Sequence, residues 1–209
     1  YARLGRAVGF DPARCVLTRQ VHGDVIRRVT AADPAGLDAP RPDCDALITD
    51  VPDTALVIFT ADCIPVLLYD PDTGAVGAAH CGWRGTALGL AEKAVRAMAA
   101  AFGSRPESLR CAIGPGIGLC CFETDGDVPA AMRAALGEAA APFLHPAGAK
   151  WHVDLKGLNR LWLQRAGVRT IDCSDSCTAC RTDRFWSHRR MGAARGSQGA
   201  VIVCKEVAK

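Results

Sequence analysis

Residues 55–85, ALVIFTADCIPVLLYDPDTGAVGAAHCGWRG, decide the fold because they read as three short strands followed by the start of a helix. The strands are expected at Ala55–Phe59, Pro65–Tyr69 and Ala75–His80, which are apolar runs of typical strand length. The second and third runs are separated only by residues 70–74, DPDTG, whose composition favours a turn. Such short connections favour hairpins and antiparallel pairs over a purely parallel sheet.

Outside this stretch, further short runs rich in Val, Ile and Leu are expected to be strands: Val25–Thr30, Ala46–Thr49, Arg110–Ile113, Val168–Cys173 and Gly199–Cys204. Three stretches are expected to be helices: Gly85–Phe102, Asp127–Ala140 with Asp127 as N-cap, and Leu155–Ala166. Strands and helices intermix without strict alternation. The predicted fold class is therefore α/β (α+β), with layered mixed β-sheets flanked by helices.

Length and composition bound the class of protein. The chain has 209 residues, of which 49% are hydrophobic, which suits one compact domain spanning 1–209. Its net charge is +3, and Lys and Arg are spread along the chain, so we expect no nucleic-acid partner. No apolar run approaches the ~18 residues that a membrane span needs, so we expect no membrane partner.

The cysteines and the start of the chain give two further expectations. The eleven cysteines are odd in number and scattered, which argues against a disulfide framework and favours a cytoplasmic protein. The first residues, YARL, read like the middle of a helix without a cap. We therefore expect that the natural protein has an N-terminal segment before residue 1.

Three side chains with metal-ligand chemistry lie at strand ends or in the turns that follow them. They are His22, Cys63 and His80, and such positions commonly line one rim of a sheet. Two His and one Cys suit a catalytic zinc ion, because three protein ligands leave a fourth position for water or substrate. The wide spacings match no compact zinc motif, and ordinary packing of each residue is the competing interpretation.

A second interpretation uses the same residues without a metal. Cys63 would be a nucleophile and His80 its general base, as in a cysteine hydrolase. Asp62 lies next to Cys63 in an apolar neighbourhood. It either orients a histidine, binds a ribose hydroxyl or caps a turn.

Other motifs give weaker signals. Gly82 and Arg84 precede and begin an expected helix, which is a natural place for an anion. The GPGIG segment at 114–118 lacks the pattern of a P-loop or a dinucleotide site, so it is either a tight turn or a backbone wall beside a ligand. Cys177 and Cys180 have the spacing of half a structural zinc site, but no second pair has this spacing. The cluster of arginines near the C-terminus either binds phosphate or forms a solvated face; it comprises Arg181, Arg184, Arg189 and Arg190.

Taken in order, these motifs closely resemble the YfiH family, whose members have also been labelled polyphenol oxidases or laccase-domain proteins. The matching segments are QVHG at 20–23, DALIT at 45–49, TADCIPV at 60–66, AAHCGWRG at 78–85, IGPGIG at 113–118, FE at 122–123, DSCT at 175–178 and FWSHRR at 185–190. Each motif is short, but their ordered set is specific and covers almost the whole chain.

The resemblance implies a layered α/β fold similar to that of a cysteine-hydrolase toxin domain. It also implies a zinc site at His22, Cys63 and His80. The implied activity is that of a purine nucleoside phosphorylase acting on adenosine, inosine and methylthioadenosine, with adenosine deaminase activity. Purine nucleosides and phosphate would be its substrates, whereas the older laccase label implies copper.

The chemistry of phosphorolysis assigns expected roles to the candidate residues. Phosphate attacks the anomeric carbon of ribose as the purine leaves, so the site needs an anion clamp and an electrophile for the leaving base. We expect the catalytic residues to be Cys63, His80 and Asp62. We expect the substrate-binding residues to be Gly82, Arg84 and Arg189. The sequence does not specify the preferred nucleoside or the number of subunits.

Two alternatives fit the residues less well. A laccase needs several copper centres with many His ligands, and this chain has five His. A single site of this type still accepts copper in place of zinc, because copper(II) generally binds such ligands more tightly. A small zinc-stabilised binding module would normally close its metal with four ligands, and the set of three leaves one position open.

Overall fold

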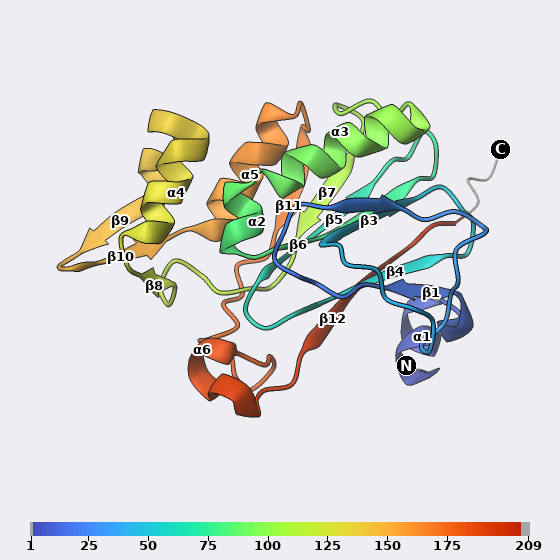
Figure 1. The fold of residues 1–209 in the computed structure, drawn as a ribbon, viewed down its shortest axis with the longest axis horizontal. Helices are drawn as coiled ribbons and strands as arrows, with labels where there is room; N and C mark the ends of the chain where they lie inside the picture. The colour runs from blue at the N-terminus through green and yellow to red at the C-terminus, as the bar shows by residue number, and fades with distance from the viewer. Residues whose placement is uncertain (1, 206–209) are drawn as a thin grey trace.

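A computed structural model describes residues 2–205, so position 1 and positions 206–209 of the predicted domain lie outside the described residues (Figure 1). Its centre is a mixed six-stranded sheet with the strand order β11-β7-β5-β6-β3-β2. The strands are β2 (Ile26–Arg28), β3 (Ala46–Thr49), β5 (Ile64–Tyr69), β6 (Val76–Cys81), β7 (Arg110–Ile113) and β11 (Thr170–Cys173). The predicted antiparallel hairpin is confirmed, since β5 pairs antiparallel with β6 in the register Leu67 to Ala78.

A three-stranded sheet and a helical layer cover the two faces of this central sheet (Figure 1). The small sheet contains β1 (Cys15–Leu17), β4 (Ala55–Thr60) and β12 (Gln198–Val203), with β4 in the middle. The helices are α2 (Trp83–Ala87), α3 (Leu90–Phe102) and α5 (Leu155–Arg165). The predicted class of layered mixed sheets flanked by helices is therefore confirmed.

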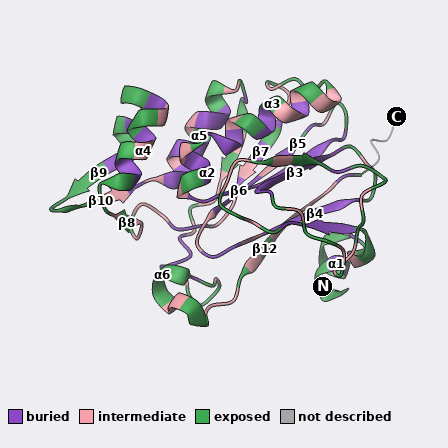
Figure 2. Cartoon of the chain, viewed as in Figure 1, coloured by how far each residue is buried: buried purple, intermediate pink, exposed green. Residues whose placement is uncertain are grey.

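Alternation along the central strands fills a separate core on each side of the sheet. On β5, Val66 and Leu68 belong to the core under the helices, whereas Leu67 packs against the core between the two sheets. On β6, Val76 and Ala78 belong to the core between the sheets. Side chains two residues apart share a face, so His80 points to the same side, toward the small sheet. Figure 2 shows the buried residues concentrated along these strands and the inner sides of the helices.

The expected helix at Gly85–Phe102 is two helices, because the chain turns between α2 and α3. Gly89 has a positive φ of 72°, and a Cβ atom there would lie 3.5 Å from the ring of Trp162. A left-handed glycine ends the first helix and starts the second. The expected end of the helical stretch at Phe102 is confirmed, and Gly103 follows it with φ of 71°.

The expected helix at Asp127–Ala140 is also shorter than predicted. The structure has α4 at Asp127–Leu136 and then a 3-10 helix, η2, at Gly137–Phe143, and the N-cap is Gly126 rather than Asp127. Gly137 has φ of 61°, which interrupts the α-helical backbone. A second small sheet lies beside α4; its strands are β8 (Glu123–Thr124), β9 (Leu144–Ala147) and β10 (Lys150–Val153).

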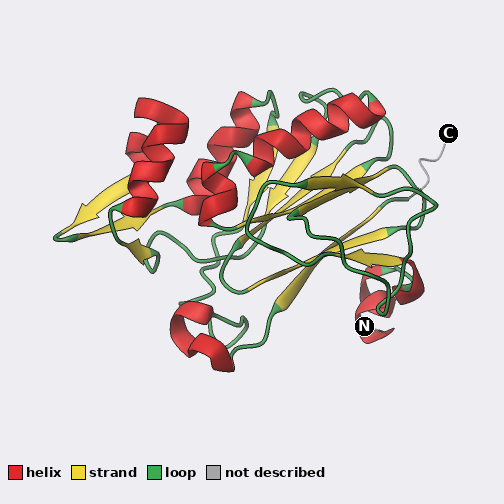
Figure 3. Ribbon diagram, viewed as in Figure 1, coloured by secondary structure: helices red, strands yellow, loops and turns green. Residues whose placement is uncertain are grey.

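The remaining elements are short and joined by loops. They are α1 (Ala2–Val8), η1 (Pro12–Arg14), α6 (His188–Met191) and η3 (Gly192–Ala194). Figure 3 shows that the chain between β11 and α6 is mainly loop. Across residues 2–205, no helix has the length and apolar character needed to cross a membrane.

Leu68 tests the importance of the core under the helices. It is fully buried on β5, whereas Leu88 at the end of α2 is 45% exposed. We expect Leu68→Ala to lower the free energy of unfolding by about 2–5 kcal/mol through lost burial and a residual cavity. Leu88→Ala should change it by less than about 0.5 kcal/mol. Urea unfolding of both variants measures the difference, and equal effects would contradict this description of the core.

Candidate active site

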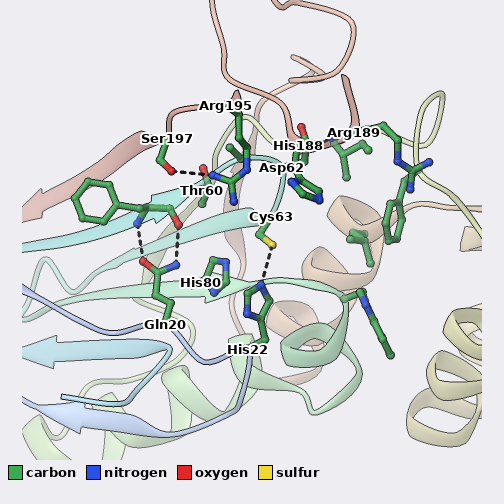
Figure 4. A pocket seen from close by; sticks show the side chains of 16 residues that line it. Gln20, His22, Thr60, Asp62, Cys63, His80, His188, Arg189, Arg195 and Ser197 are labelled. Carbon is green, nitrogen blue, oxygen red and sulfur yellow. Dashed lines mark hydrogen bonds between the residues drawn. The ribbon is translucent and has the colours of Figure 1, made fainter. Parts of the chain in front are cut away.

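A cavity of about 590 Å³ opens where the ends of the two packed sheets meet (Figure 4). Its polar and charged lining consists of Gln20, His22, Thr60, Asp62, Cys63, His80, His188, Arg189, Arg195 and Ser197. Its apolar lining consists of Phe59, Ala61, Trp83, Ile117, Phe122 and Leu155. A cavity of this size that combines apolar surface with convergent polar groups suits a small-molecule ligand.

The structure brings the three sequence-predicted metal ligands together in this cavity. His22 follows β1, Cys63 lies between β4 and β5, and His80 is on β6. Their candidate ligand atoms all lie within 4.8 Å of one another. Cys63 Sγ is 3.9 Å from His22 Nε2, and the two imidazole rings are nearly perpendicular with centroids 4.9 Å apart. Residues separated by 41 positions in the sequence thus form one compact donor group.

The buried carboxylate of Asp45 holds both histidines of this group. Its Oδ1 atom accepts a hydrogen bond from His80 Nδ1 at 2.8 Å and from the backbone N–H of His22 at 3.0 Å. Its Oδ2 atom accepts from the backbone N–H groups of Gly23 at 2.7 Å and Val21 at 3.2 Å. Since a carboxylate only accepts, Nδ1 of His80 carries a proton, and Nε2 is the ring nitrogen available to a metal that displaces its proton.

The backbone at His22 is unusual and depends on these bonds. His22 has φ of 62°, in the left-handed region that a non-glycine residue rarely adopts. Such a conformation costs of order 1–3 kcal/mol and persists only where its surroundings fix it. Here the Asp45 carboxylate fixes the conformation of His22 by accepting hydrogen bonds from three consecutive backbone N–H groups. The strained backbone thereby presents the His22 ring to Cys63.

The electrostatics of the group favour a thiolate. Burial alone would raise the pKa of Cys63, but hydrogen bonds from His22 and His80 and the charges of their rings lower it to about 6. Burial alone would lower the pKa of His80, but its bonds to Asp45 and Cys63 raise it to about 9. Burial also opposes ionisation of Asp45, yet the bonds from His80 and from backbone N–H groups lower its pKa. A thiolate is the form of cysteine that binds metals and also the form that attacks carbon.

Two neighbours fix the geometry further. The side chain of Gln20 makes paired hydrogen bonds with the backbone of Phe59: its Nε2 donates to the carbonyl at 2.7 Å, and its Oε1 accepts from the N–H at 2.8 Å (Figure 4). This pairing attaches the loop that carries His22 to the C-terminal end of β4. Gly82 lies directly behind the group, because a Cβ atom there would be 3.0 Å from Cys63 Sγ and 3.2 Å from His22 Cδ2.

Asp62 connects the cavity to the C-terminal loops. Its Oδ1 accepts from the hydroxyl of Thr178 at 2.5 Å, and its Oδ2 accepts from the backbone N–H of Arg189 at 2.8 Å. Arg189 lies in the first turn of α6, so one oxygen of Asp62 caps that turn. Of the three roles considered from the sequence, this contact corresponds to capping, while the side chain still lines the cavity.

The arginines expected to bind substrate occupy different places. Arg189 lines the cavity, and its guanidinium donates to the carbonyls of Cys121 at 3.1 Å and Glu123 at 2.8 Å. Arg84 is exposed and stacks over the ring of Trp83 with 4.3 Å to the centroid, outside the residues that line the cavity. Arg195, which was not predicted, does line it.

Sequence reasoning missed several residues of the site. Asp45, Gln20, Arg195 and His188 had no assigned role, although all but Arg195 lie within the matching motifs. Asp45 carries a usable signal, because a carboxylate directly before the apolar strand Ala46–Thr49 is expected to need a partner. Among the aromatic residues, Phe59 and Trp83 line the cavity beside Phe122.

The donor group fits a zinc ion on the chemistry of its atoms. It offers two imidazole nitrogens and one thiolate from one wall of an open cavity, and the Asp45 bond fixes one imidazole as metal-ligating histidines require. Within residues 2–205, the other group of this kind consists of four cysteines and no histidine. The described chain therefore lacks the several His-rich centres of a multicopper oxidase.

The chain is similar to known proteins of one family. Residues 1–205 match a family model described as multi-copper polyphenol oxidoreductase laccase. The chain is 37% identical over 207 residues to purine nucleoside phosphorylase YlmD of Geobacillus stearothermophilus, covering 96% of this chain and 74% of that protein. It is 40% identical over 202 residues to a purine nucleoside phosphorylase of Deinococcus radiodurans, with coverage of 96% and 74%. The crystal structure of the hypothetical protein YfiH from Bacillus licheniformis has a TM-score of 0.92 and 34% identity, covering 97% of this chain and 79% of that one.

The role of Asp45 can be tested by stability. Asp45→Ala leaves the His80 imidazole and three buried N–H groups without their acceptor, so we expect a loss of about 3–5 kcal/mol in the free energy of unfolding. Asp24 is a suitable control, since it makes only a surface ion pair with Lys93. Asp24→Ala should cost about 1 kcal/mol or less. Equal losses in urea unfolding would show that Asp45 does not organise the site.

Proposed function

The chain belongs to the multi-copper polyphenol oxidoreductase laccase family, in agreement with its resemblance to the YfiH proteins, and from this premise we propose that it is a purine nucleoside phosphorylase. It would convert adenosine, inosine or methylthioadenosine and phosphate into the free base and a pentose 1-phosphate. The observation that carries the proposal is the convergence of His22, Cys63 and His80 in a cavity that also holds aromatic side chains and two arginines.

We propose zinc as the metal of this site, with copper as a substituting ion. His22, Cys63 and His80 would hold it, and the absence of a side chain at Gly82 lets the backbone pack directly behind them. When bound, zinc supplies a Lewis acid for charge that develops on a substrate or on water. Asp45 keeps the proton on Nδ1 of His80, so the other ring nitrogen stays available as a ligand.

The apolar wall of the cavity suits a purine. Phe122, Trp83 and Phe59 all line it and offer flat, apolar surface for a heteroaromatic ring. Phe122 is itself held in place, since the Arg189 guanidinium lies 5.8 Å from its ring centroid. Two nearby aromatic residues, Phe185 and the exposed Trp186, are not among the lining residues.

Arg195 is the best candidate for the phosphate clamp. Its Nη1 donates to the carbonyl of Gly196 and to the hydroxyl of Ser197, but its buried Nε has no partner within the described structure. A buried donor without a partner is costly, and an anion in the cavity would satisfy it. In the view of Figure 4, Arg195 lies across the cavity from His22 and His80. Arg189 would add a second positive charge, and Arg84 remains a candidate from the sequence alone.

The proposed reaction joins phosphate to the sugar and releases the purine. A phosphate oxygen attacks the anomeric carbon while the bond from that carbon to the purine nitrogen breaks, and the electron pair stays on the purine. The sugar passes through an oxocarbenium-like state, which nearby negative charge stabilises. Arg195 and Arg189 would hold phosphate against the sugar. Asp62, fixed by Thr178 and Arg189, would face the sugar as a ribose-binding or charge-stabilising carboxylate.

Adenosine deamination is a further activity that we propose for the same site. It would need activated water at the amino-bearing carbon of adenine in place of phosphate at the sugar. A competing function is cysteine hydrolysis, which the lowered pKa of Cys63 beside His80 favours. The two mechanisms predict opposite responses to metal removal, since a free thiolate would become more reactive.

We propose a cytoplasmic location, which is supported by all eleven cysteines being free of disulfide bonds. We also propose that residues 1–209 act as one domain, with purine nucleosides and phosphate as its partners. The matched relatives are longer than this chain, which covers 74% of YlmD.

His80 tests the catalytic assignment. We expect His80→Ala to lower kcat/KM for inosine by roughly 10²–10³-fold or more, because it removes a ligand and the partner of Asp45. His145 on β9 is exposed and outside the cavity, so His145→Ala should retain activity. Phosphate-dependent release of hypoxanthine, followed by chromatography, measures both. Full activity and full zinc content in folded His80→Ala protein would refute the assignment.

Arg195 tests the phosphate site separately. Arg195→Ala should raise the KM for phosphate by roughly 10–100-fold, the cost of losing charged hydrogen bonds, while the KM for inosine changes little. Arg184 carries the same charge on an exposed loop and is 68% accessible, so Arg184→Ala is the matched control. If Arg195→Ala left phosphate saturation unchanged, Arg189 or Arg84 would have to provide the clamp.

A further inference from the structure

A second cluster of metal-type side chains lies outside the groups used by the proposed reaction. It consists of Cys120, Cys121, Cys177 and Cys180, whose sulfur atoms all lie within 4.8 Å of one another. Cys180 Sγ is 3.5 Å from Cys120 Sγ and 3.4 Å from Cys121 Sγ. All four are free thiols. The C-x-x-C pair at 177–180 thus lies beside the adjacent pair Cys120–Cys121, which is about sixty residues earlier in the sequence.

The spacing of these sulfurs matches a tetrathiolate metal site. Zinc–sulfur bonds of about 2.3 Å in a tetrahedron place the sulfurs about 3.8 Å apart. The observed separations, from 3.4 Å to within 4.8 Å, span this value. We propose that Cys120, Cys121, Cys177 and Cys180 bind one zinc ion in a closed structural site, separate from the group at His22, Cys63 and His80.

Donors around the cluster suit a site of negative charge. Four thiolates around a divalent cation carry a net charge of −2, which N–H donors and cations stabilise. The backbone N–H of Gly118 donates to Cys177 Sγ at 3.2 Å, and Nη2 of Arg190 lies 3.7 Å from Cys121 Sγ. Arg190 is itself held by a bond from its Nε to the carbonyl of Ala179. These groups would compensate the charge of the bound site.

The proposed metal would join two loops that form one wall of the cavity. The first loop carries Cys120 and Cys121 together with the cavity residues Ile117 and Phe122. The second carries Cys177, which forms a parallel bridge with Gly116.

The neighbour of Cys177 extends this link into the cavity. Thr178 donates its N–H to the carbonyl of Gly116 and its hydroxyl to Asp62. A metal ion with four ligands at this place would hold together two loops that lack regular secondary structure. It would thereby fix Phe122 and Asp62 from outside the cavity.

Zinc content distinguishes the two proposed sites. Protein purified from zinc-supplemented cells should contain about two zinc ions per chain, the Cys177→Ser/Cys180→Ser variant about one, and Cys63→Ser also about one. Cys173 is a half-buried thiol outside the cluster, four residues before Cys177 in the sequence, so Cys173→Ser should keep the wild-type zinc content. If the double variant matched Cys173→Ser in zinc content, the proposal would be overturned.

Cobalt spectroscopy of Cys63→Ser protein provides a second readout that does not require the loop variant to fold. Cobalt(II) bound by four thiolates gives intense thiolate-to-cobalt charge-transfer bands and tetrahedral d–d bands, and these should survive the loss of Cys63. Their absence would overturn the proposal. Mass spectrometry of native protein provides a third readout. A mass lower by two hydrogens at the cluster, without bound metal, would show a disulfide in place of the zinc site and would overturn the proposal. None of these three readouts depends on nucleoside phosphorolysis.

Discussion

The buried carboxylate of Asp45 is the constraint on which the candidate site depends. It accepts hydrogen bonds from the His80 ring and from three successive backbone N–H groups around His22. One group thus sets the orientation of one histidine through its side chain and of the other through its backbone. Because the φ of His22 is unfavourable by itself, the loop needs this acceptor to keep its shape. The position of Cys63 then completes a donor group in which the thiolate form is favoured.

The layered fold explains why these residues meet. Strand alternation directs His80 toward the small sheet, and the turn between β4 and β5 brings Cys63 to the same end of the two packed sheets. The loops after β7 and β11 then close the cavity from the other side, joined through the bridge between Gly116 and Cys177. Metal-type chemistry, an apolar surface and two arginines consequently share one cavity. These features favour a nucleoside and phosphate as substrates over oxidation by copper, which requires large or multi-centre sites.

Local sequence patterns made most of the fold predictable. Contacts between residues far apart in the sequence did not follow from these patterns. The β5–β6 hairpin and the strand at Ala46–Thr49 follow from apolar runs bounded by turn residues. The break between α2 and α3 was missed because it depends on the left-handed backbone at Gly89, which the apolar pattern of residues 85–102 does not specify. The three candidate ligands came from residue type and position at strand ends. Asp45, Arg195 and the pairing of Cys120–Cys121 with Cys177 and Cys180 depend on contacts between distant segments, which no local pattern specifies.

We propose that this chain cleaves purine nucleosides with phosphate through a metal held by His22, Cys63 and His80. The most direct test is to follow inosine phosphorolysis in one preparation before chelation, after removal of the metal and after zinc is returned. Phosphate-dependent release of hypoxanthine should disappear on chelation and return with zinc. Undiminished phosphorolysis by metal-free, folded protein would contradict the account.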